Sequence, residues 1–295
     1  MRPFPVVDAT SWDLESDEQM GKKPKAWLRD PEGQLWLYKA RTMNTTASGV
    51  YPKGDDWTEK VASEVAALLG VPAARVELAT RGGDPGTLSL NIAPQLDLVL
   101  GNDFLAGRYE DYDTTQRHHI VGYTVERVLG VLADVGSPPG TRLDLGGAGY
   151  FAGFLMLDAL VGNTDRHHEN WGLVTTDHLR LAPSFDHASC LGFQLSDDQR
   201  AQRLNDPTGG GIQRWVDGAR TPFESQPSTF AAARYALEFV GSAVREAWHA
   251  SLLDVTEEML EVVDRLPPAV ISEVTRRFAK ELLVRNHHVL VTPSG

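Results

Sequence analysis

Two acidic residues and one amide, placed on either side of a short predicted hairpin, constrain the fold more than any other feature of the sequence. Asp165 and Asn170 are five positions apart, and Asp186 follows Asn170 by sixteen residues. Residues 172–182 between them have the pattern of a strand, a tight turn and a second strand. Because an antiparallel hairpin brings its two ends side by side, we expect Asp186 to lie beside Asp165 and Asn170.

This spacing is typical of loops that serve phosphoryl transfer. In such loops an Asp accepts the proton of the substrate hydroxyl, and an Asn five residues later holds a metal ion. Oxygen ligands of different charge hold Mg²⁺ without cancelling the positive charge that phosphates need. The pattern predicts Asp165 as the catalytic residue and Asn170 and Asp186 as Mg²⁺ ligands. The alternative for so short a motif is a polar surface loop.

Length and charge limit the function classes. A chain of 295 residues can form one large domain or two lobes. A formal net charge of -12 disfavours nucleic acid and anionic membranes as partners. A single cysteine, Cys190, excludes an internal disulfide framework, and residues 1–8 lack the apolar run of a secretion signal. We therefore expect a cytoplasmic protein with neither a nucleic-acid nor a membrane partner.

The N-terminal third predicts a small α+β lobe. Residues 25–40 have the pattern of a hairpin with a type I turn. Residues 57–69 predict a helix that ends at Gly70, and residues 42–55 predict an irregular loop. Two more short strands are expected near residues 76–78 and 87–92.

One lysine stands out on the second strand of the predicted hairpin. By the two-residue period of a strand, Lys39 shares a face with Leu35 and Leu37. A lysine between two leucines needs an anionic partner. An edge-strand lysine that extends its ammonium group to water is the alternative.

The remainder of the chain predicts a mainly helical lobe. Helical periodicity covers residues 116–135, 148–160, 229–252, 256–266 and 271–284. Residues 194–226 predict a long polar loop. The fold class is therefore α+β and bilobal, with a β-rich lobe over residues 1–97 and a helical lobe over residues 98–295.

The loop GNTDRHHENW (162–171) and the segment LAPSFDHAS (181–189) resemble those of the HipA-like serine/threonine kinases. That family has Asn-x-Asp-x-His-x-x-Asn in its catalytic segment and Leu-Ala-Pro-x-Tyr-Asp in its metal segment. The loop also has distant similarity to phosphoinositide-3-kinase-like enzymes. The resemblance implies a protein-kinase-like fold and an ATP- and Mg²⁺-dependent phosphotransferase. It also implies that His167 braces the catalytic loop or contacts the γ-phosphate, although a structural histidine is an equal alternative.

The resemblance extends to the N-terminal lobe. Residues 16–25 are similar to the family's phosphate loop, which implies that Gly21 and Lys25 bind ATP. The family's ATP-contacting lysine corresponds to Lys39, and the glutamate that holds it corresponds to Glu59. Glu64 is a rival partner for Lys39.

Each of these residues also has a simpler interpretation. Glu59 could instead complete a capping box with Asp56 at the start of the helix, and Gly21 and Lys25 could be ordinary surface residues.

The resemblance does not determine which molecule accepts the phosphate. It implies a serine or threonine of a protein, but small molecules and lipid headgroups are alternatives. A nucleotide-binding pseudokinase is a further alternative, because the glycine of the kinase Asp-Phe-Gly motif is absent: Phe185 precedes the metal-binding Asp186 and His187 follows it. An antitoxin partner is conceivable under the resemblance but unsupported, since HipA-like toxins usually carry an additional subdomain before the phosphate loop.

A hydrolytic metal centre is the third alternative. It would use acidic and histidine residues of the same two segments, namely Asp165, His167, His168, Asp186 and His187.

Overall fold

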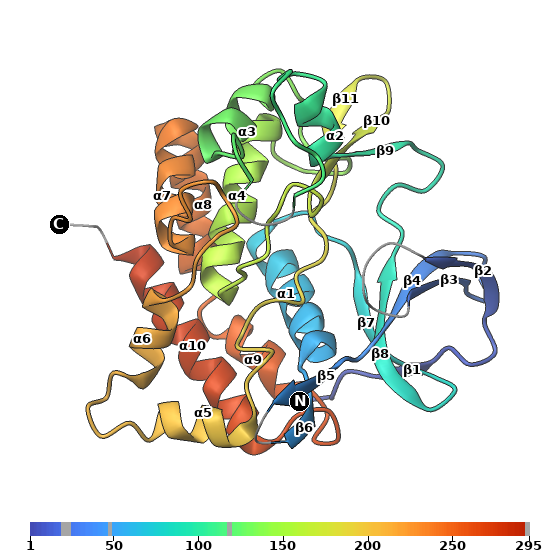
Figure 1. The fold of residues 1–295 in the computed structure, drawn as a ribbon, viewed down its shortest axis with the longest axis vertical. Coiled ribbons are helices and arrows are strands. Elements are labelled where there is room, and N and C mark those ends of the chain that lie inside the picture. Colours follow the sequence, from blue (N-terminus) through green and yellow to red (C-terminus); the bar gives the residue numbers. More distant parts are fainter. Residues whose placement is uncertain (19–24, 47–48, 117–119, 293–295) are drawn as a thin grey trace.

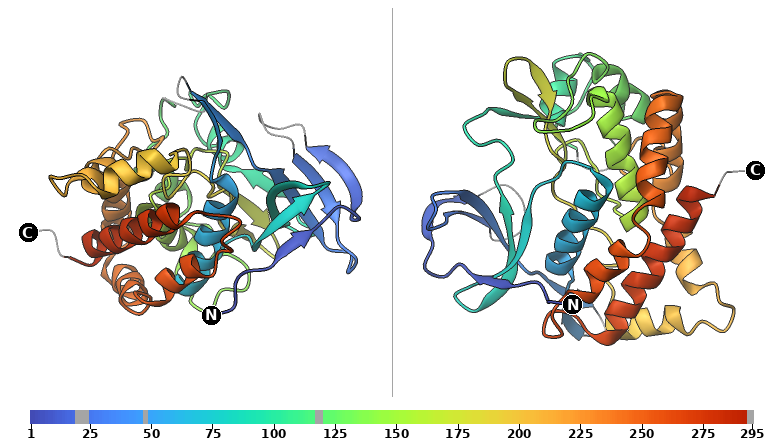
Figure 2. Two further views of the ribbon diagram at one scale, coloured as in Figure 1. Left: turned by 90° about the horizontal axis from the view of Figure 1, so that it is seen from below. Right: turned by 180° about the vertical axis from the view of Figure 1, so that it is seen from behind.

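The computed structural model describes residues 1–18, 25–46, 49–116 and 120–292. A twisted sheet of N-terminal residues lies beside a larger helical part, as Figure 1 and both views of Figure 2 show. The bilobal α+β prediction is confirmed. The boundary at residues 97 and 98 stays a prediction; it falls between the last strand of the large sheet and the first strand of the helical part.

The large sheet has six strands in the order β1-β7-β8-β4-β3-β2. Their bounds are β1 Val6–Asp8, β2 Asp13–Glu18, β3 Lys25–Arg29, β4 Leu35–Ala40, β7 Val76–Arg81 and β8 Asp84–Leu90. The β3–β4 hairpin is the predicted one. Its turn is closed by hydrogen bonds from the Asp30 N–H to the Gln34 carbonyl and from the Gly33 N–H to the Asp30 carbonyl, and Gly33 has a φ of 83° that few other residues adopt.

The two faces of this sheet have different neighbours. Alternate residues of β3 and β4, among them Leu28, Trp36 and Tyr38, are buried in a small core with Leu88 of β8. The other face carries Trp27, Leu37 and Lys39, which line a cavity toward the helical part. The two-residue period therefore separates a packing face from a ligand-accessible face.

Helix α1 (Asp55–Leu69) joins the sheet to the helical part (Figure 1). It ends at Gly70, whose φ of 74° is left-handed, as the prediction required. Val61 and Val65 are fully buried in one core that continues into the helices. The two lobes are therefore packed against a shared helix.

The helical part surrounds α4 (Gly146–Val161), which is buried along nearly all its length. The bounds of the other helices are α2 Gly101–Ala106, α3 Val125–Val131, α5 Asp197–Leu204, α6 Gly211–Asp217, α7 Thr229–Phe239, α8 Ser242–Leu253, α9 Glu258–Asp264 and α10 Glu273–Val291. Strands β9 Leu98–Leu100, β10 Gly172–Thr175 and β11 Leu179–Leu181 form a small sheet, and β5 Met43–Thr46 pairs with β6 Gly49–Pro52.

Several predicted element boundaries are wrong for local reasons. Of the helix expected over 116–135, residues 117–119 lie outside the described residues, and in the described remainder the helix is confined to α3, because Gly122 has a φ of 76° and Thr124 caps the helix that follows. The helix expected over 229–252 is divided at Gly241, whose φ is 90°. The C-terminal helix, expected over 271–284, is longer and ends at Val291.

Two expected loops contain regular structure. Residues 42–55 include the β5–β6 hairpin. Residues 194–226 include α5 and α6, and α5 begins with a capping box formed by Ser196 and Gln199. Strands β1 and β2 were not predicted. They pair with β7 and β3 and carry little alternation of their own.

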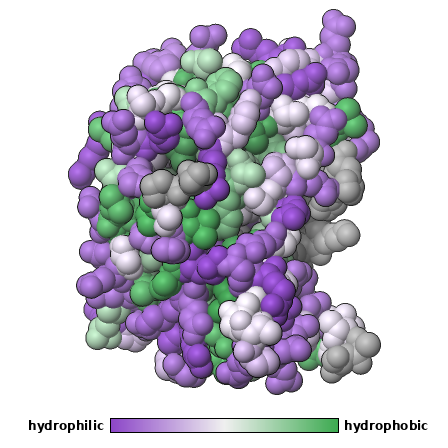
Figure 3. Space-filling model, turned by 90° about the vertical axis from the view of Figure 1, so that its left-hand side faces the viewer, coloured by the Kyte–Doolittle hydropathy of each residue, from purple (hydrophilic) through white to green (hydrophobic). Residues whose placement is uncertain are grey.

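The outer face of the helical part is mostly hydrophilic, with hydrophobic patches between the charged groups (Figure 3). Exposed apolar side chains of the outer helices include Tyr235, Phe239 and Leu253. None of the helices in the described ranges combines the length and apolarity needed to cross a membrane.

Candidate active site

The β10–β11 hairpin brings the two predicted segments together. Leu173 pairs with Leu181 in antiparallel register, so the residues that follow the hairpin lie beside the loop that precedes it. Asn170 and Asp186 both line one cavity, and Lys39 lines it from the sheet. The hairpin therefore places Asn170 and Asp186 together, as the spacing predicts, while Asp165 of the same loop is not among the residues that line this cavity.

The loop that begins after α4 is shaped by its own side chains. Gly162 ends the helix with a φ of 69°. The Asn163 amide donates to Asp158 at 2.8 Å and accepts from the Asp165 backbone at 3.2 Å. Asn170 donates through Nδ2 to the Asp165 carbonyl at 2.6 Å. These bonds fix the distance between Asp165 and Asn170 and leave Oδ1 of Asn170 for another partner.

Arg166 fastens this loop to the segment that carries Asp186. Its guanidinium group makes two 2.8 Å bonds to the Asp158 carboxylate, and both side chains are almost fully buried. It also donates to the Asn170 carbonyl at 2.7 Å and, at 3.4 Å, to the Phe185 carbonyl. Burial disfavours its charge, but Asp158 more than compensates and raises the Arg166 pKa. The sequence does not identify this ion pair, because Asp158 belongs to α4 and Arg166 to the loop that follows the end of that helix.

Buried aromatic residues of the core support the catalytic loop through hydrogen bonds. The Tyr123 hydroxyl donates to the Arg166 carbonyl at 2.8 Å and accepts from Trp171 at 3.1 Å. Tyr112 hydrogen-bonds Nδ1 of His168 at 2.7 Å. His168 is fully buried, so it supports the loop from within the core.

Lys39 forms the electrostatic centre of the cavity. Its Nζ lies 3.0 Å from Glu59 and 3.0 Å from Asp186. Burial alone would lower the Lys39 pKa, but the two carboxylates raise it, so the amine stays charged. An ammonium group has three donors, and within the described chain only these two acceptors engage it. One donor therefore remains for a ligand.

The partner of Lys39 is Glu59, and the rival interpretations are wrong. Glu64 instead pairs with Lys60 at 2.7 Å. Helix α1 begins at Asp55 without a side-chain cap, so Glu59 completes no capping box.

Lys25 lines the same cavity. It stands directly opposite Lys39 in the β3–β4 register, so two lysines lie side by side on one wall of the cavity. Gly21, the other predicted phosphate-loop residue, lies outside the described residues.

The cavity has a volume of about 410 Å³ and two chemically different ends. At one end the lining side chains are apolar: Trp27, Leu35, Leu37, Ile92, Leu98 and Leu100. The other end carries Lys25, Lys39, His167, Asn170 and Asp186. A ligand with a flat apolar group and a chain of anionic groups matches both ends.

The charges at the polar end also fit a divalent cation. Lys39 contacts two carboxylates, so this trio carries one negative charge in excess, and Glu169 lines the same cavity. Asn170 and Asp186 offer the amide and carboxylate oxygens that Mg²⁺ prefers. The residues therefore fit the predicted metal.

Two histidines near these segments have structural contacts. His167 accepts from the Glu169 backbone at 3.2 Å and its Nε2 lies 4.0 Å from Asp165 Oδ1. His187 is buried against Ser184 at 2.7 Å. Burial and the nearby Arg166 lower the His187 pKa well below 6.5, so it is neutral. Asp186, just before it, has a left-handed φ of 57°, a strained geometry that is common at functional sites.

The hydrolytic metal centre receives no support from this geometry. His168 and His187 are engaged by Tyr112 and Ser184 in the core. Across the described ranges, no group of three or more His, Cys, Asp or Glu residues is placed to hold a metal.

Comparison with known proteins supports the fold. No protein-family model matches the sequence, and no curated protein does so significantly. Among solved structures, the chain is similar to the Helicobacter pylori proinflammatory kinase CtkA, with a TM-score of 0.74 and 16% identity over 97% of both chains. It is also similar to HipA of Shewanella oneidensis MR-1, solved in a complex with HipB and operator DNA. There the TM-score is 0.53 and the identity 13%, over 97% of this chain and 67% of HipA. The chain therefore has a HipA-like kinase fold.

Proposed function

We propose that the protein is an ATP- and Mg²⁺-dependent kinase that transfers the γ-phosphate to a serine or threonine hydroxyl of a protein. The observation that carries this proposal is the placement of Lys39. It lies buried between Glu59 and Asp186, with one donor left, in a cavity that Asn170 also lines. The HipA-like kinase fold supports the same reaction class.

In this proposal Lys39 and Lys25 bind the ATP phosphates, with Gly21 in the phosphate loop between β2 and β3. Glu59 holds Lys39 in place through its 3.0 Å ion pair. Asn170 and Asp186 hold Mg²⁺, which when bound would neutralise charge on the phosphates. The apolar end of the cavity takes the adenine ring.

Asp165 acts on the acceptor in this proposal. Its carboxylate is 39% exposed and accepts from Ser189 Oγ at 3.2 Å, which restrains its orientation. The acceptor oxygen bonds to the γ-phosphorus, the bond from that phosphorus to the β–γ bridging oxygen breaks, and Asp165 takes the hydroxyl proton. His167 braces the loop through its bond to the Glu169 backbone.

Two measurements test the proposal on the purified protein. Mg·ATP should raise the melting temperature, because a ligand that binds only the folded state stabilises it. Label from the γ-position of ATP should appear on protein, and Asp165→Asn should remove that label while keeping the thermal shift. Transfer by Asp165→Asn at the wild-type rate would refute the assigned role.

A nucleotide-binding module without transfer is the second candidate. The glycine of the kinase Asp-Phe-Gly motif is absent, and His187, buried and neutral, directly follows Asp186. This candidate predicts the thermal shift with no transfer, so the same pair of measurements separates the two. The cytoplasmic location and the lack of nucleic-acid and membrane partners stay predictions, and an antitoxin partner stays an unsupported alternative.

A further inference from the structure

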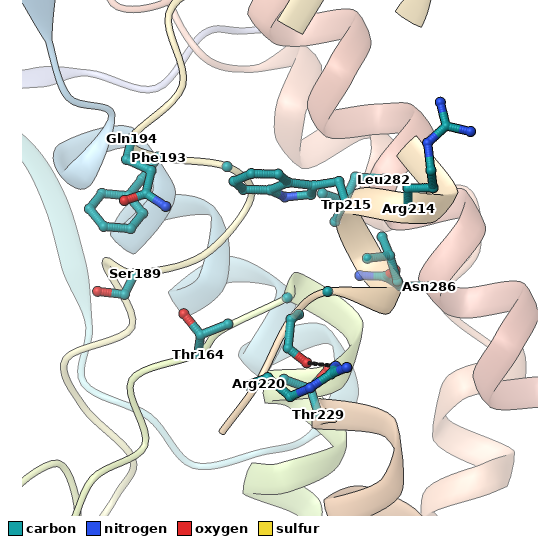
Figure 4. A pocket seen from close by; sticks show the side chains of 15 residues that line it. Thr164, Ser189, Phe193, Gln194, Arg214, Trp215, Arg220, Thr229, Leu282 and Asn286 are labelled. Atoms are coloured by element: carbon teal, nitrogen blue, oxygen red, sulfur yellow. Dashed lines mark hydrogen bonds between the residues drawn. The ribbon is translucent and has the colours of Figure 1, made fainter. Parts of the chain in front are cut away.

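A second cavity of about 410 Å³ lies on the other side of the catalytic loop (Figure 4). Its walls come from the start of that loop, the chain after Asp186, helix α6 with the turn that follows it, and helix α10. None of its lining residues lines the cavity around Lys39.

Two chain segments run from one cavity to the other. Thr164 lines the second cavity, whereas His167 and Asn170 line the first. Asp165 lies between these positions. Asp165 therefore belongs to the short stretch of loop that connects residues of the two cavities.

The second segment, residues 185–193, also connects the two cavities. Phe185 and Asp186 line the first cavity, and Ser189 and Phe193 line the second. Ser189 also donates to the Asp165 carboxylate at 3.2 Å. The second cavity is therefore connected to Asp165 by contact as well as by chain order.

The second cavity offers apolar surface to an occupant. The rings of Phe193 and Trp215 face the cavity from different segments (Figure 4). Both side chains are only partly buried. Arg203 stacks 4.8 Å from the Trp215 ring centre, which holds the indole in place. Aromatic walls of this kind are suited to a bulky apolar side chain.

The same cavity also carries an uncompensated cation. Arg214 is paired with Asp206. Arg220 donates only to backbone carbonyls, those of Asp217 at 2.7 Å and Ala219 at 3.1 Å, and in the described chain no carboxylate contacts it. The Arg220 guanidinium group is therefore available to an acidic group of a bound ligand.

We propose that this cavity binds the phosphate acceptor, and that the acceptor is a protein segment with an acidic residue and a bulky apolar residue near its serine or threonine. Arg220 recognises the acid, Phe193 and Trp215 receive the apolar side chain, and the hydroxyl reaches Asp165. A peptide provides these three groups along one chain. This inference rests on the proposed kinase activity.

Arrayed serine and threonine peptides, varied one position at a time, test the inference with Mg²⁺ and γ-labelled ATP. The wild type should favour Asp or Glu at one position and a large apolar residue at another. Arg220→Gln should lower the acid preference about fivefold, the size expected for an exposed ion pair, and Arg220→Lys should retain part of it. Trp215→Ala should reduce the apolar preference by at least about tenfold. Arg277→Gln, an exposed arginine on α10, is the matched control and should change neither.

Three results would overturn the inference. An acid preference that Arg220→Gln leaves intact would remove Arg220 from recognition, and labelling of small hydroxyl compounds but no peptide would exclude a protein acceptor. Mg·ATP binding without any labelled acceptor would reject the acceptor site but leave nucleotide binding in place. If Mg·ATP did not bind at all, the proposed function itself would fail, and this inference with it.

Discussion

Two buried lysines of this protein have the same kind of partners but different surroundings. Lys39 contacts Glu59 and Asp186, and Lys60 contacts Glu64 and Glu77. Lys60 uses its third donor on the Val76 carbonyl at 2.7 Å. Lys39 has no third acceptor within the described residues.

The charge around the two lysines differs as well. Arg75 bonds Glu77 at 2.9 Å, so two cations balance the two carboxylates of the Lys60 cluster. The Lys39 cluster keeps one excess negative charge and lines a cavity. In the Lys60 cluster every lysine donor is used and the charges balance, so the cluster stabilises the fold. In the Lys39 cluster one lysine donor and one negative charge remain, so the cluster is suited to binding a ligand.

The largest expected effect is a difference in phosphate transfer between a carboxylate variant of the Lys39 cluster and one of the Lys60 cluster. Asp186→Asn should reduce phosphate transfer by about a thousandfold or more, roughly 4 kcal/mol, because it removes a metal ligand and a partner of Lys39. Glu77→Gln in the Lys60 cluster should keep transfer within about twofold. Initial rates at saturating Mg·ATP measure both. Equal losses in the two variants would mean that the clusters do not differ in function.

The next effect concerns a pair that is purely structural. Arg166→Leu should lower the free energy of unfolding by about 3 kcal/mol, since it leaves Asp158 buried and unpaired. Arg29→Gln breaks the exposed pair with Glu15 and should lower it by less than about 1 kcal/mol. Urea denaturation of both variants provides the comparison. Similar losses would show that burial does not decide the value of these pairs.

A smaller effect is expected at the residue that positions Lys39. Glu59→Gln should reduce transfer roughly tenfold, about 1.4 kcal/mol, because the amide still accepts a hydrogen bond but loses the charge. Glu64→Gln, on the same helix, should leave transfer unchanged. Steady-state kinetics on both variants will check this, and a larger loss in Glu64→Gln would reverse the assignment.

The smallest effect is a pH dependence of stability. The folded state holds His187 neutral with a lowered pKa, whereas the unfolded chain binds a proton below about pH 6.5. Stability from this residue should therefore decline below that pH, by up to about 1.4 kcal/mol per pH unit. His187→Gln should flatten the decline, and exposed His249→Gln should not. Identical pH profiles for the wild type and His187→Gln would contradict the buried, neutral state.

The sequence predicted the parts of the site that depend on local spacing. Asp165, Asn170 and Asp186 are joined by a hairpin whose two-residue period is visible in the residues, and the face of Lys39 follows from the same period. The position of Glu59 rather than Glu64 beside Lys39 depends on how α1 is rotated against the sheet, which helical periodicity leaves undetermined.

Other parts of the site depend on contacts between distant segments. Arg166 and Asp158 meet across the end of α4, and nothing in their spacing distinguishes them from surface residues. The second cavity depends on α6, within a stretch whose polar composition and glycines indicated a loop. The apolar residues of α6, Ile212, Trp215 and Val216, form only one turn of an apolar stripe, and glycines precede and follow the helix.

Calorimetric titration of Mg·ATP into the wild type, Lys39→Met and Lys60→Met tests the central claim most directly. Both substitutions remove a buried lysine from two carboxylates, so both should lower stability. We expect Lys60→Met to bind Mg·ATP within about threefold of the wild type and Lys39→Met to bind roughly a hundredfold more weakly, near 2.7 kcal/mol. Equal affinity in Lys39→Met and the wild type would contradict the account.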